Sequence, residues 1–233
     1  MATEVKQKQA TGHSTDVPSE EKVVQTARQF WDRNSKFITY VLGALVLVVG
    51  GYFVYQSMFV APEEKKAEEL IWKAQEYYKV DSFAKALNGD GVNVGFLRVI
   101  ARHGGTKAGN LAKFYAGSCY LELGDFNNAI KYLKDFSTSQ PALKVRAYGL
   151  LGDAYSELGK KQEAVEYYTK AGNAFKEDEV NAPEYLFRAA LLYQELGKNK
   201  EAIALLKQIK EDYPNHMRAF EVDKYLGKLG EVN

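Results

Sequence analysis

The residues that most often perform catalysis are scarce and scattered in this chain. Its 233 residues include three histidines, His13, His103 and His216, and one cysteine, Cys119. The histidines fall in three separate segments, and no set of His, Cys and carboxylate residues has metal-ligand spacing. Cys119 stands at helical spacing among apolar residues, where a small buried side chain is expected. We therefore predict no enzyme activity, no metal and no cofactor.

A glycine-containing segment, residues 103–109, reads HGGTKAG and superficially suggests a phosphate-binding loop. It lacks the G-x-x-x-x-G-K-[ST] spacing, and no strand is expected before it. The charge balance argues against nucleic acid as well, because residues 63–233 carry 25 Lys and Arg against 25 Asp and Glu. Phosphate binding needs an excess of clustered cations. We predict neither nucleic acid nor a small-molecule substrate as a ligand.

A stronger signal is internal repetition. Three segments beginning at Gly117, Gly152 and Ala190 share Tyr, Leu, Gly and Ala at the same offsets, and they start 35 and 38 residues apart. The small first residue lets a second helix approach closely, and the later glycine suits the left-handed end of the first helix. A period near 34 is typical of a helix-turn-helix repeat.

This pattern resembles the tetratricopeptide repeat family at about six positions in each of three repeats, near residues 110–143, 145–178 and 183–215. The family often has Trp where this chain has Lys113 and Tyr148, so the repeats are divergent. The resemblance implies an all-α helical solenoid that binds other proteins. A degenerate helix pair is expected near 63–105, and a capping helix near 216–229, which completes a repeat domain over 63–233.

The resemblance also implies a peptide-binding groove, because the first helices of such repeats line the inner face of the solenoid. The residues expected there are Leu111, Phe114, Ser118, Arg146, Gly149, Asp153, Glu184, Phe187 and Leu191. The alternative that Phe114 and Phe187 are core residues stays open. A carboxylate recurs at one place of each repeat and suits either a basic partner or a solvated helix end, namely Glu122, Glu157 and Glu195.

An apolar segment precedes the repeats. Residues 37–60 carry no charge and are long enough to cross a hydrocarbon core about 30 Å thick. Aromatic residues crowd both ends of the segment, as at a membrane interface. A cleaved signal peptide fits poorly, since 36 residues precede the run and its length exceeds the usual apolar region of about 7–15 residues. We predict one transmembrane helix.

The charges beside this segment favour one orientation. Arg28, Arg33 and Lys36 flank its N-terminal side, whereas Glu63 and Glu64 come first on the other side. The positive-inside bias then predicts a cytoplasmic N-terminus and a periplasmic repeat domain in a bacterial inner membrane.

Two further features lie in or before the span. Residues 1–19 are predicted to be a disordered tail, and residues 20–36 an amphipathic juxtamembrane helix. Small residues recur every seven positions at Gly43, Gly50 and Ser57. This stripe suits docking of a partner's membrane helix, although glycine is common in such helices for other reasons.

The order of a short tail, one span and exported repeats is similar to that of the YfgM-type ancillary subunits of the Sec translocon. That resemblance implies the Sec channel and envelope chaperones as partners. A scaffold for envelope or division complexes would share every feature. A receptor with cytosolic repeats would need the opposite orientation.

Overall fold

The computed structural model describes residues 20–231, so the predicted disordered tail at 1–19 lies outside the described residues. Within 20–231 the chain is helical, with one isolated bridge between Gly89 and Val94. It divides into two compact units, the first ending at Met58 and the second beginning at Phe59. Each unit is described by itself.

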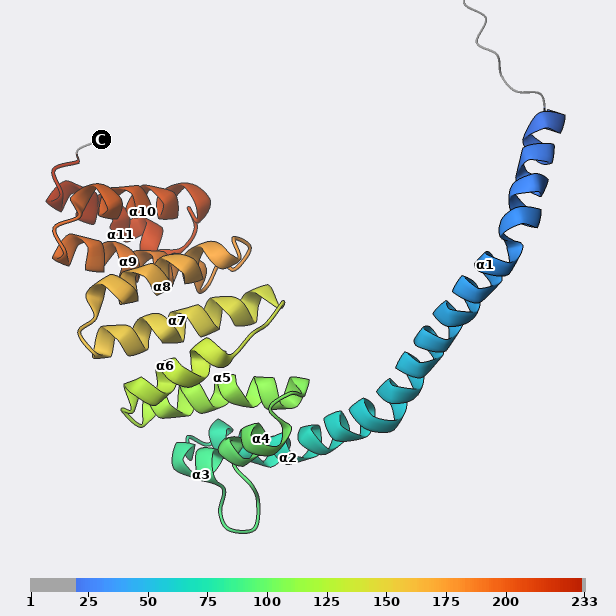
Figure 1. Cartoon of the computed structure of the whole chain (residues 1–233). Coiled ribbons are helices and arrows are strands. Elements are labelled where there is room, and N and C mark those ends of the chain that lie inside the picture. Colours follow the sequence, from blue (N-terminus) through green and yellow to red (C-terminus); the bar gives the residue numbers. More distant parts are fainter. Residues whose placement is uncertain (1–19, 232–233) are drawn as a thin grey trace, which may run out of the picture. The chain divides into compact units, whose positions relative to one another are not determined.

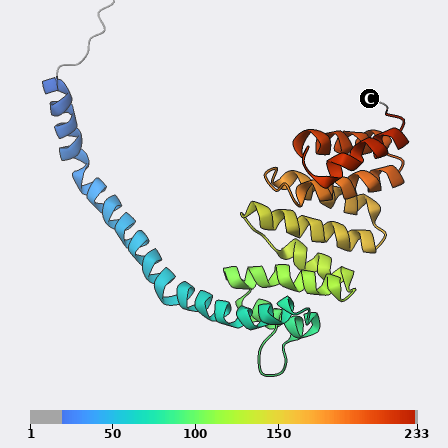
Figure 2. The same ribbon diagram turned by 180° about the vertical axis from the view of Figure 1, so that it is seen from behind.

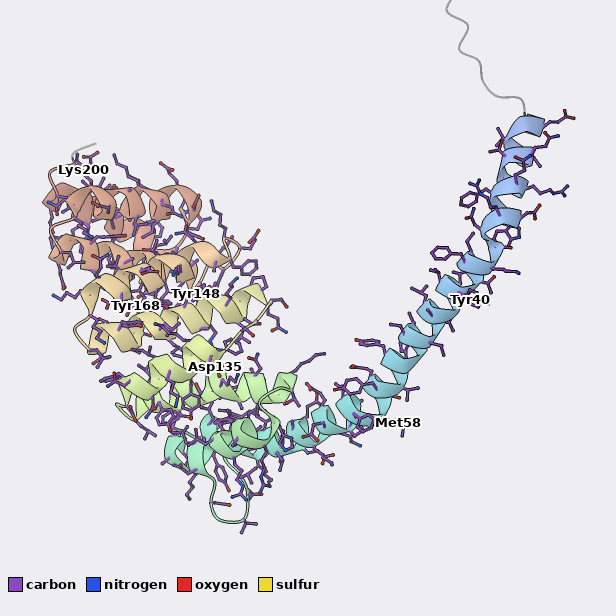
Figure 3. All side chains as sticks on the ribbon, viewed as in Figure 1. Tyr40, Met58, Asp135, Tyr148, Tyr168 and Lys200 are labelled. Carbon is purple, nitrogen blue, oxygen red and sulfur yellow. The ribbon has the colours of Figure 1, made fainter. Side chains whose placement is uncertain are left out.

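The first unit contains helix α1, Glu20–Tyr55, which the π-helical segment η1, Gln56–Val60, follows. The predicted juxtamembrane and transmembrane helices are thus parts of one continuous helix. An 18-residue window of the helical stretch Val23–Lys79 has a mean hydropathy of 2.2, and none of this window is buried. Figure 3 shows Tyr40 and Met58 on this exposed surface. The chain therefore has a helix long and apolar enough to span a membrane.

The second unit is a stack of helices, most of them in antiparallel pairs, that follow one another in the order of the sequence, as Figures 1 and 2 show from opposite sides. Three of these pairs coincide with the three predicted repeats: α5 with α6, α7 with α8, and α9 with α10. The bounds are α2, Ala61–Lys79; α3, Phe83–Asn88; α4, Phe96–His103; α5, Lys107–Glu122; α6, Phe126–Asp135; α7, Pro141–Glu157; α8, Lys161–Ala174; α9, Ala182–Glu195; α10, Asn199–Asp212; and α11, Met217–Lys228.

Local sequence explains where these helices begin and end. Thr106 caps α5 by accepting a hydrogen bond from the Gly109 amide at 2.9 Å, and α7 begins at Pro141, which cannot donate within the preceding turn. The first helix of each repeat ends before a glycine with positive φ, as the sequence predicted. The values are 77° at Gly124, 68° at Gly159 and 71° at Gly197.

The structure also explains why the first two repeats have a glycine at Gly117 and Gly152. A Cβ atom added to Gly117 would lie 2.5 Å from Leu133 Cγ on α6, and one added to Gly152 would lie 2.4 Å from Tyr168 Cδ1 on α8. Both distances are shorter than any normal van der Waals contact. In the first two repeats, the second helix therefore packs directly onto the backbone of the first helix.

Two hydrophobic cores stabilise the unit. One lies among α2, α3, α4 and α5, and the other extends from α5 to α11. Helix α5 contributes to both, with Ala112, Ala116 and Cys119 in the first core and Phe114 in the second. The half-buried Tyr115 packs against both cores.

The N-terminal end of this unit differs from the expected helix pair, because α3 forms a third, short helix between α2 and α4. A turn that begins at Gly89 follows α3. Asp90 shapes this turn by accepting hydrogen bonds from the amides of Val92 and Asn93, at 2.9 and 2.6 Å, and from the Tyr77 hydroxyl at 2.5 Å. At the other end, α11 corresponds to the predicted capping helix.

Candidate protein-binding groove

The nine predicted groove residues all lie on first helices of the repeats: Leu111, Phe114 and Ser118 on α5; Arg146, Gly149 and Asp153 on α7; and Glu184, Phe187 and Leu191 on α9. They differ strongly in burial. Phe114 and Phe187 are 1% and 2% exposed, so both are core side chains, which is the alternative that the sequence left open. Leu111 and Leu191 are half-buried beside the two cores.

Each of the two phenylalanines is covered by side chains that follow it in the chain. The Arg218 guanidinium on α11 lies 4.5 Å from the Phe187 ring centroid, and the Tyr225 ring meets Phe187 edge-on at 5.0 Å. The Arg146 guanidinium lies 5.6 Å from the Phe114 ring centroid, and the Phe136 ring lies 5.4 Å away. A cation over the ring face is attracted by the ring quadrupole. Successive repeats are thus joined through an aromatic ring and a cation.

Two small residues of the predicted groove hold helices together. Ser118 is 3% exposed, and its hydroxyl lies 2.9 Å from the Tyr78 hydroxyl on α2. Gly149 faces the Tyr185 ring so closely that a Cβ atom there would lie 2.1 Å from Tyr185 Cζ. Neither position leaves a side chain free for a ligand.

Two of the three charged residues of the predicted groove, Asp153 and Glu184, join an interhelical network. Asp153 Oδ1 accepts hydrogen bonds from the Tyr168 hydroxyl at 2.6 Å and from Arg188 Nη1 at 2.7 Å. Glu184 accepts two hydrogen bonds from Arg218, Nε to Oε2 at 2.7 Å and Nη2 to Oε1 at 3.1 Å. Arg188 Nε also lies 3.5 Å from Glu184 Oε1. We call Asp153, Tyr168, Arg188, Glu184 and Arg218 the charge ladder.

The ladder shifts the pKa values of its members. The Arg218 hydrogen bonds lower the pKa of the Glu184 carboxyl. Burial raises the pKa of the Tyr168 hydroxyl, and the Asp153 carboxylate raises it further. Both groups therefore keep their hydrogen-bonding forms at neutral pH. Sequence reasoning did not select Arg188 or Arg218, although the i,i+4 spacing of Glu184 and Arg188 was a readable signal for an ion pair.

An open hollow lies at the C-terminal ends of the first helices, beside the ladder. Two carboxylates in its wall, Glu122 and Glu157, are exposed, whereas Asp153 is paired with Arg188. The third acid of the repeated set, Glu195, pairs with Lys161 Nζ at 2.8 Å. The lining residues are Leu121, Glu122, Gly124, Phe126, Asp153, Ser156, Glu157, Tyr168 and Arg188. The hollow thus combines apolar surface with an excess of negative charge.

Cys119 and His103, two remaining candidates for chemistry among the described residues, are engaged in packing and in a side-chain contact. Cys119 is fully buried, as predicted for a core residue, and burial raises the pKa of its thiol to about 12. His103 Nδ1 lies 2.6 Å from Glu63 Oε1. Within residues 20–231, no three His, Cys, Asp or Glu side chains converge where a metal ion could bind.

The predicted docking stripe lies on α1 and η1. Gly43, Gly50 and Ser57 are exposed, and a Cβ atom at either glycine would meet nothing within 4 Å. The Ser57 hydroxyl donates a hydrogen bond to the Val54 carbonyl at 3.1 Å. The stripe as a helix-docking surface stays a prediction.

Comparison with known proteins identifies the repeats. Residues 111–142 and 184–216 match one model of the tetratricopeptide repeat, and residues 145–171 match another. No curated protein sequence matches the chain. The chain therefore contains tetratricopeptide repeats at the three places that the sequence predicted, and such repeats imply a protein–protein interaction scaffold.

Solved structures show the same fold. Two crystal structures of MamA align with TM-scores of 0.50 and 0.52 at 19% and 18% identity, covering 68% and 72% of this chain and 85% and 84% of theirs. A Podosopora anserina structure described as a kinesin light chain with nearly identical TPR-like repeats aligns with a TM-score of 0.53 at 16% identity, covering 71% of this chain and 86% of that one.

Proposed function

We propose that the chain is a membrane-anchored adaptor that binds segments of other proteins in the hollow between its first two repeats. The observation that carries this proposal is the lining of the hollow, where Glu122 and Glu157 are exposed beside the apolar surface of Leu121 and Phe126. Tetratricopeptide repeats supply the precedent for protein binding.

The negative charge of this surface comes from Glu122 and Glu157 and not from the charge ladder. Asp153 and Glu184 are neutralised by Arg188 and Arg218, so these residues offer little net charge to a partner. The two exposed carboxylates keep their charge. A partner segment that places Lys or Arg next to an apolar side chain fits this combination best.

The anchor is the apolar segment 37–60, which comprises the second part of α1 and η1. Its length, its lack of charge and the exposure of its side chains support a single uncleaved span. The cations before the span support a cytoplasmic N-terminus and periplasmic repeats in a bacterial inner membrane. The stripe of Gly43, Gly50 and Ser57 then serves as the contact with a partner's membrane helix.

This arrangement fits an accessory factor of the Sec translocon that links the channel to envelope chaperones or assists exported proteins. The support is the resemblance of the anchor-then-repeats order to YfgM-type subunits. A scaffold for envelope or division complexes has the same anatomy and differs only in its partners. A receptor with cytosolic repeats has the reverse topology.

Site-specific photo-crosslinking in native membranes tests the proposal. A photoreactive amino acid replaces Ser156 in the hollow, and a second variant carries it at Gly50 in the span. We expect Ser156 to capture a chaperone or an exported chain and Gly50 to capture a channel subunit. Lys200, exposed at the start of α10 and away from the hollow lining, is the matched control position (Figure 3).

The outcomes separate the alternatives. Capture of division or envelope-assembly proteins at Ser156 would support the scaffold, and equal adducts at Ser156 and Lys200 would reject the hollow as a binding site. Protease treatment of sealed inverted vesicles tests the topology, because the repeats are protected if they are periplasmic and digested if they are cytosolic.

A further inference from the structure

The last helix of the solenoid exposes an apolar stripe where a capping helix normally presents polar residues. On α11, Met217 is 71% exposed and Phe220 is 77% exposed. Lys224 and Gly227 continue the same stripe at helical spacing and are also exposed. A Cβ atom added to Gly227 would meet nothing within 4 Å, so the stripe is open there.

The position of Phe220 corresponds to that of Phe187. Helix α11 repeats the burial pattern of α9 thirty-three residues later, because the buried Ala219 and Val222 match the buried Leu186 and Ala189. By the same offset Phe220 matches Phe187, which is 2% exposed because α11 covers it. Phe220 thus holds a docking position that no described helix of this chain covers.

The chain itself indicates what covers such a ring. Phe187 on α9 lies under the Arg218 guanidinium of α11, and Phe114 on α5 lies under the Arg146 guanidinium of α7. Both phenylalanines therefore contact a cation from the helix two places later in the chain. The occupant of the α11 stripe is expected to be a helix that places a cation over Phe220.

A second copy of α11 meets this requirement. If two α11 helices pair antiparallel about a twofold axis at the level of Val222, Phe220 of each copy faces Lys224 of the other. The same symmetry places the long Met217 side chain against the open Gly227. The stripe is thus complementary to itself in both charge and volume, as a twofold interface requires.

We propose that α11 is a homodimerisation helix, with the contacts Phe220 to Lys224 and Met217 to Gly227 across the twofold axis. A pair of 12-residue helices buries less than the roughly 800 Å² per partner of a standard stable interface. The dimer is therefore weak in dilute solution and forms when copies are concentrated, as in a lipid bilayer.

Cysteine cross-linking of the full chain in lipid vesicles tests the geometry. One chain carries Met217→Cys and another carries Gly227→Cys, and the two are oxidised alone or mixed. We expect disulfide-linked dimers in the mixture only, because in the antiparallel pair two equivalent positions lie about 15 Å apart along the helix axes, beyond the reach of a disulfide. The native Cys119 is buried and present in every sample, so the unmodified chain gives the background.

Charge exchange tests the pairing itself. Phe220→Lys, added to both cysteine chains, places the new cation of each copy opposite Lys224 of the other. It should lower the cross-linked fraction at least tenfold. Adding Lys224→Glu to Phe220→Lys creates an opposite-charge pair and should restore it. Val92→Lys is the matched control, because Val92 is 90% exposed and lies outside α11, and it should leave the yield unchanged.

Two results would overturn the proposal. Equal dimer yield from Met217→Cys alone would indicate a parallel or random encounter. A mixture yield no higher than that from Val92→Cys mixed with Gly227→Cys would indicate that the stripe does not bind a second copy.

Discussion

Arg218 on α11 holds Glu184 on α9 by two parallel hydrogen bonds, while its guanidinium covers the Phe187 ring at 4.5 Å. One side chain thus supplies both an ionic and a cation–π contact between the last repeat and the capping helix. Arg218→Ala removes a charge-assisted pair and should lower the free energy of unfolding by about 1–3 kcal/mol. Urea unfolding of the full chain in detergent, followed by circular dichroism, measures the change. Arg218→Lys should recover only part of it, because an ammonium cannot form both bonds in one plane.

The same pair makes stability depend on pH. Arg218 holds the pKa of the Glu184 carboxyl below its ordinary value of 4.5, so the folded state favours the ionised form. This contribution is present above the ordinary pKa and is lost as pH falls through the lowered one. The urea midpoints of the wild type and Glu184→Gln should therefore converge as pH decreases from 7 toward 3. A constant difference over that range would contradict the assignment.

Phe187→Ala should be among the most damaging single substitutions in the repeats. The side chain is 2% exposed and touches Tyr225 and Arg218 from α11. Its removal leaves a cavity and should cost about 3–5 kcal/mol. Phe220→Ala is the matched control, because this exposed ring should change stability by no more than about 0.5 kcal/mol in dilute solution. Similar losses in both variants would show that Phe187 is not a core residue.

Two glycines offer opposite outcomes for one substitution. Gly152→Ala drives a Cβ atom to 2.4 Å from the Tyr168 ring and should destabilise the chain by about 1–3 kcal/mol. Gly227→Ala places a Cβ atom in open space on a helix and should stabilise it by about 0.5–1 kcal/mol. Thermal unfolding of both variants under identical dilute conditions compares the two signs directly.

The carboxylates of the hollow should contribute to partner binding. Glu122→Gln with Glu157→Gln removes two exposed charges worth about 0.5–1 kcal/mol each toward a basic segment, a loss of roughly 5- to 30-fold in affinity. The yield of adducts from the photoreactive Ser156 position measures it. The wild-type yield should fall as salt rises, whereas the double variant should respond less. Glu195→Gln is the control, since Glu195 pairs with Lys161 and does not line the hollow.

Cys119 should resist alkylation in the folded chain. It is fully buried, and its thiol pKa is raised to about 12, so the reactive thiolate is scarce at pH 8. The maleimide labelling rate should rise by orders of magnitude as urea unfolds the chain, with the same midpoint as the unfolding transition. Rapid labelling without urea would mean that α5 opens locally.

The repeats were predictable because their signals are local. Small residues such as Gly152 and terminal glycines such as Gly159 have roles that depend on one helix pair. The charge ladder was not predictable, because Arg218 meets Glu184 only after α11 has stacked on α9. Phe187 was ambiguous for the same reason, since its burial depends on Tyr225, thirty-eight residues later.

The place of the hollow also depends on tertiary packing. The sequence predicted that Phe114 and Ser118 would face a ligand, but both are buried. Phe136 and Arg146 cover Phe114, and Ser118 packs against Tyr78 of α2. The open surface lies one or two turns later, at Glu122 and Glu157, where the helices end. In the sequence, the recurrence of these acids and the predicted groove residue Asp153 pointed there.

Helix α5 belongs to both hydrophobic cores, through Cys119 and its alanine neighbours on one side and Phe114 on the other. In an array where each helix pair contacts only its neighbours, such a helix governs cooperativity. Loss of α5 would separate the α2–α4 segment from the later repeats, and each would then unfold at its own stability. Amide hydrogens of α5 should therefore exchange only when the whole domain unfolds. This helix couples the unfolding of two segments that would otherwise unfold separately.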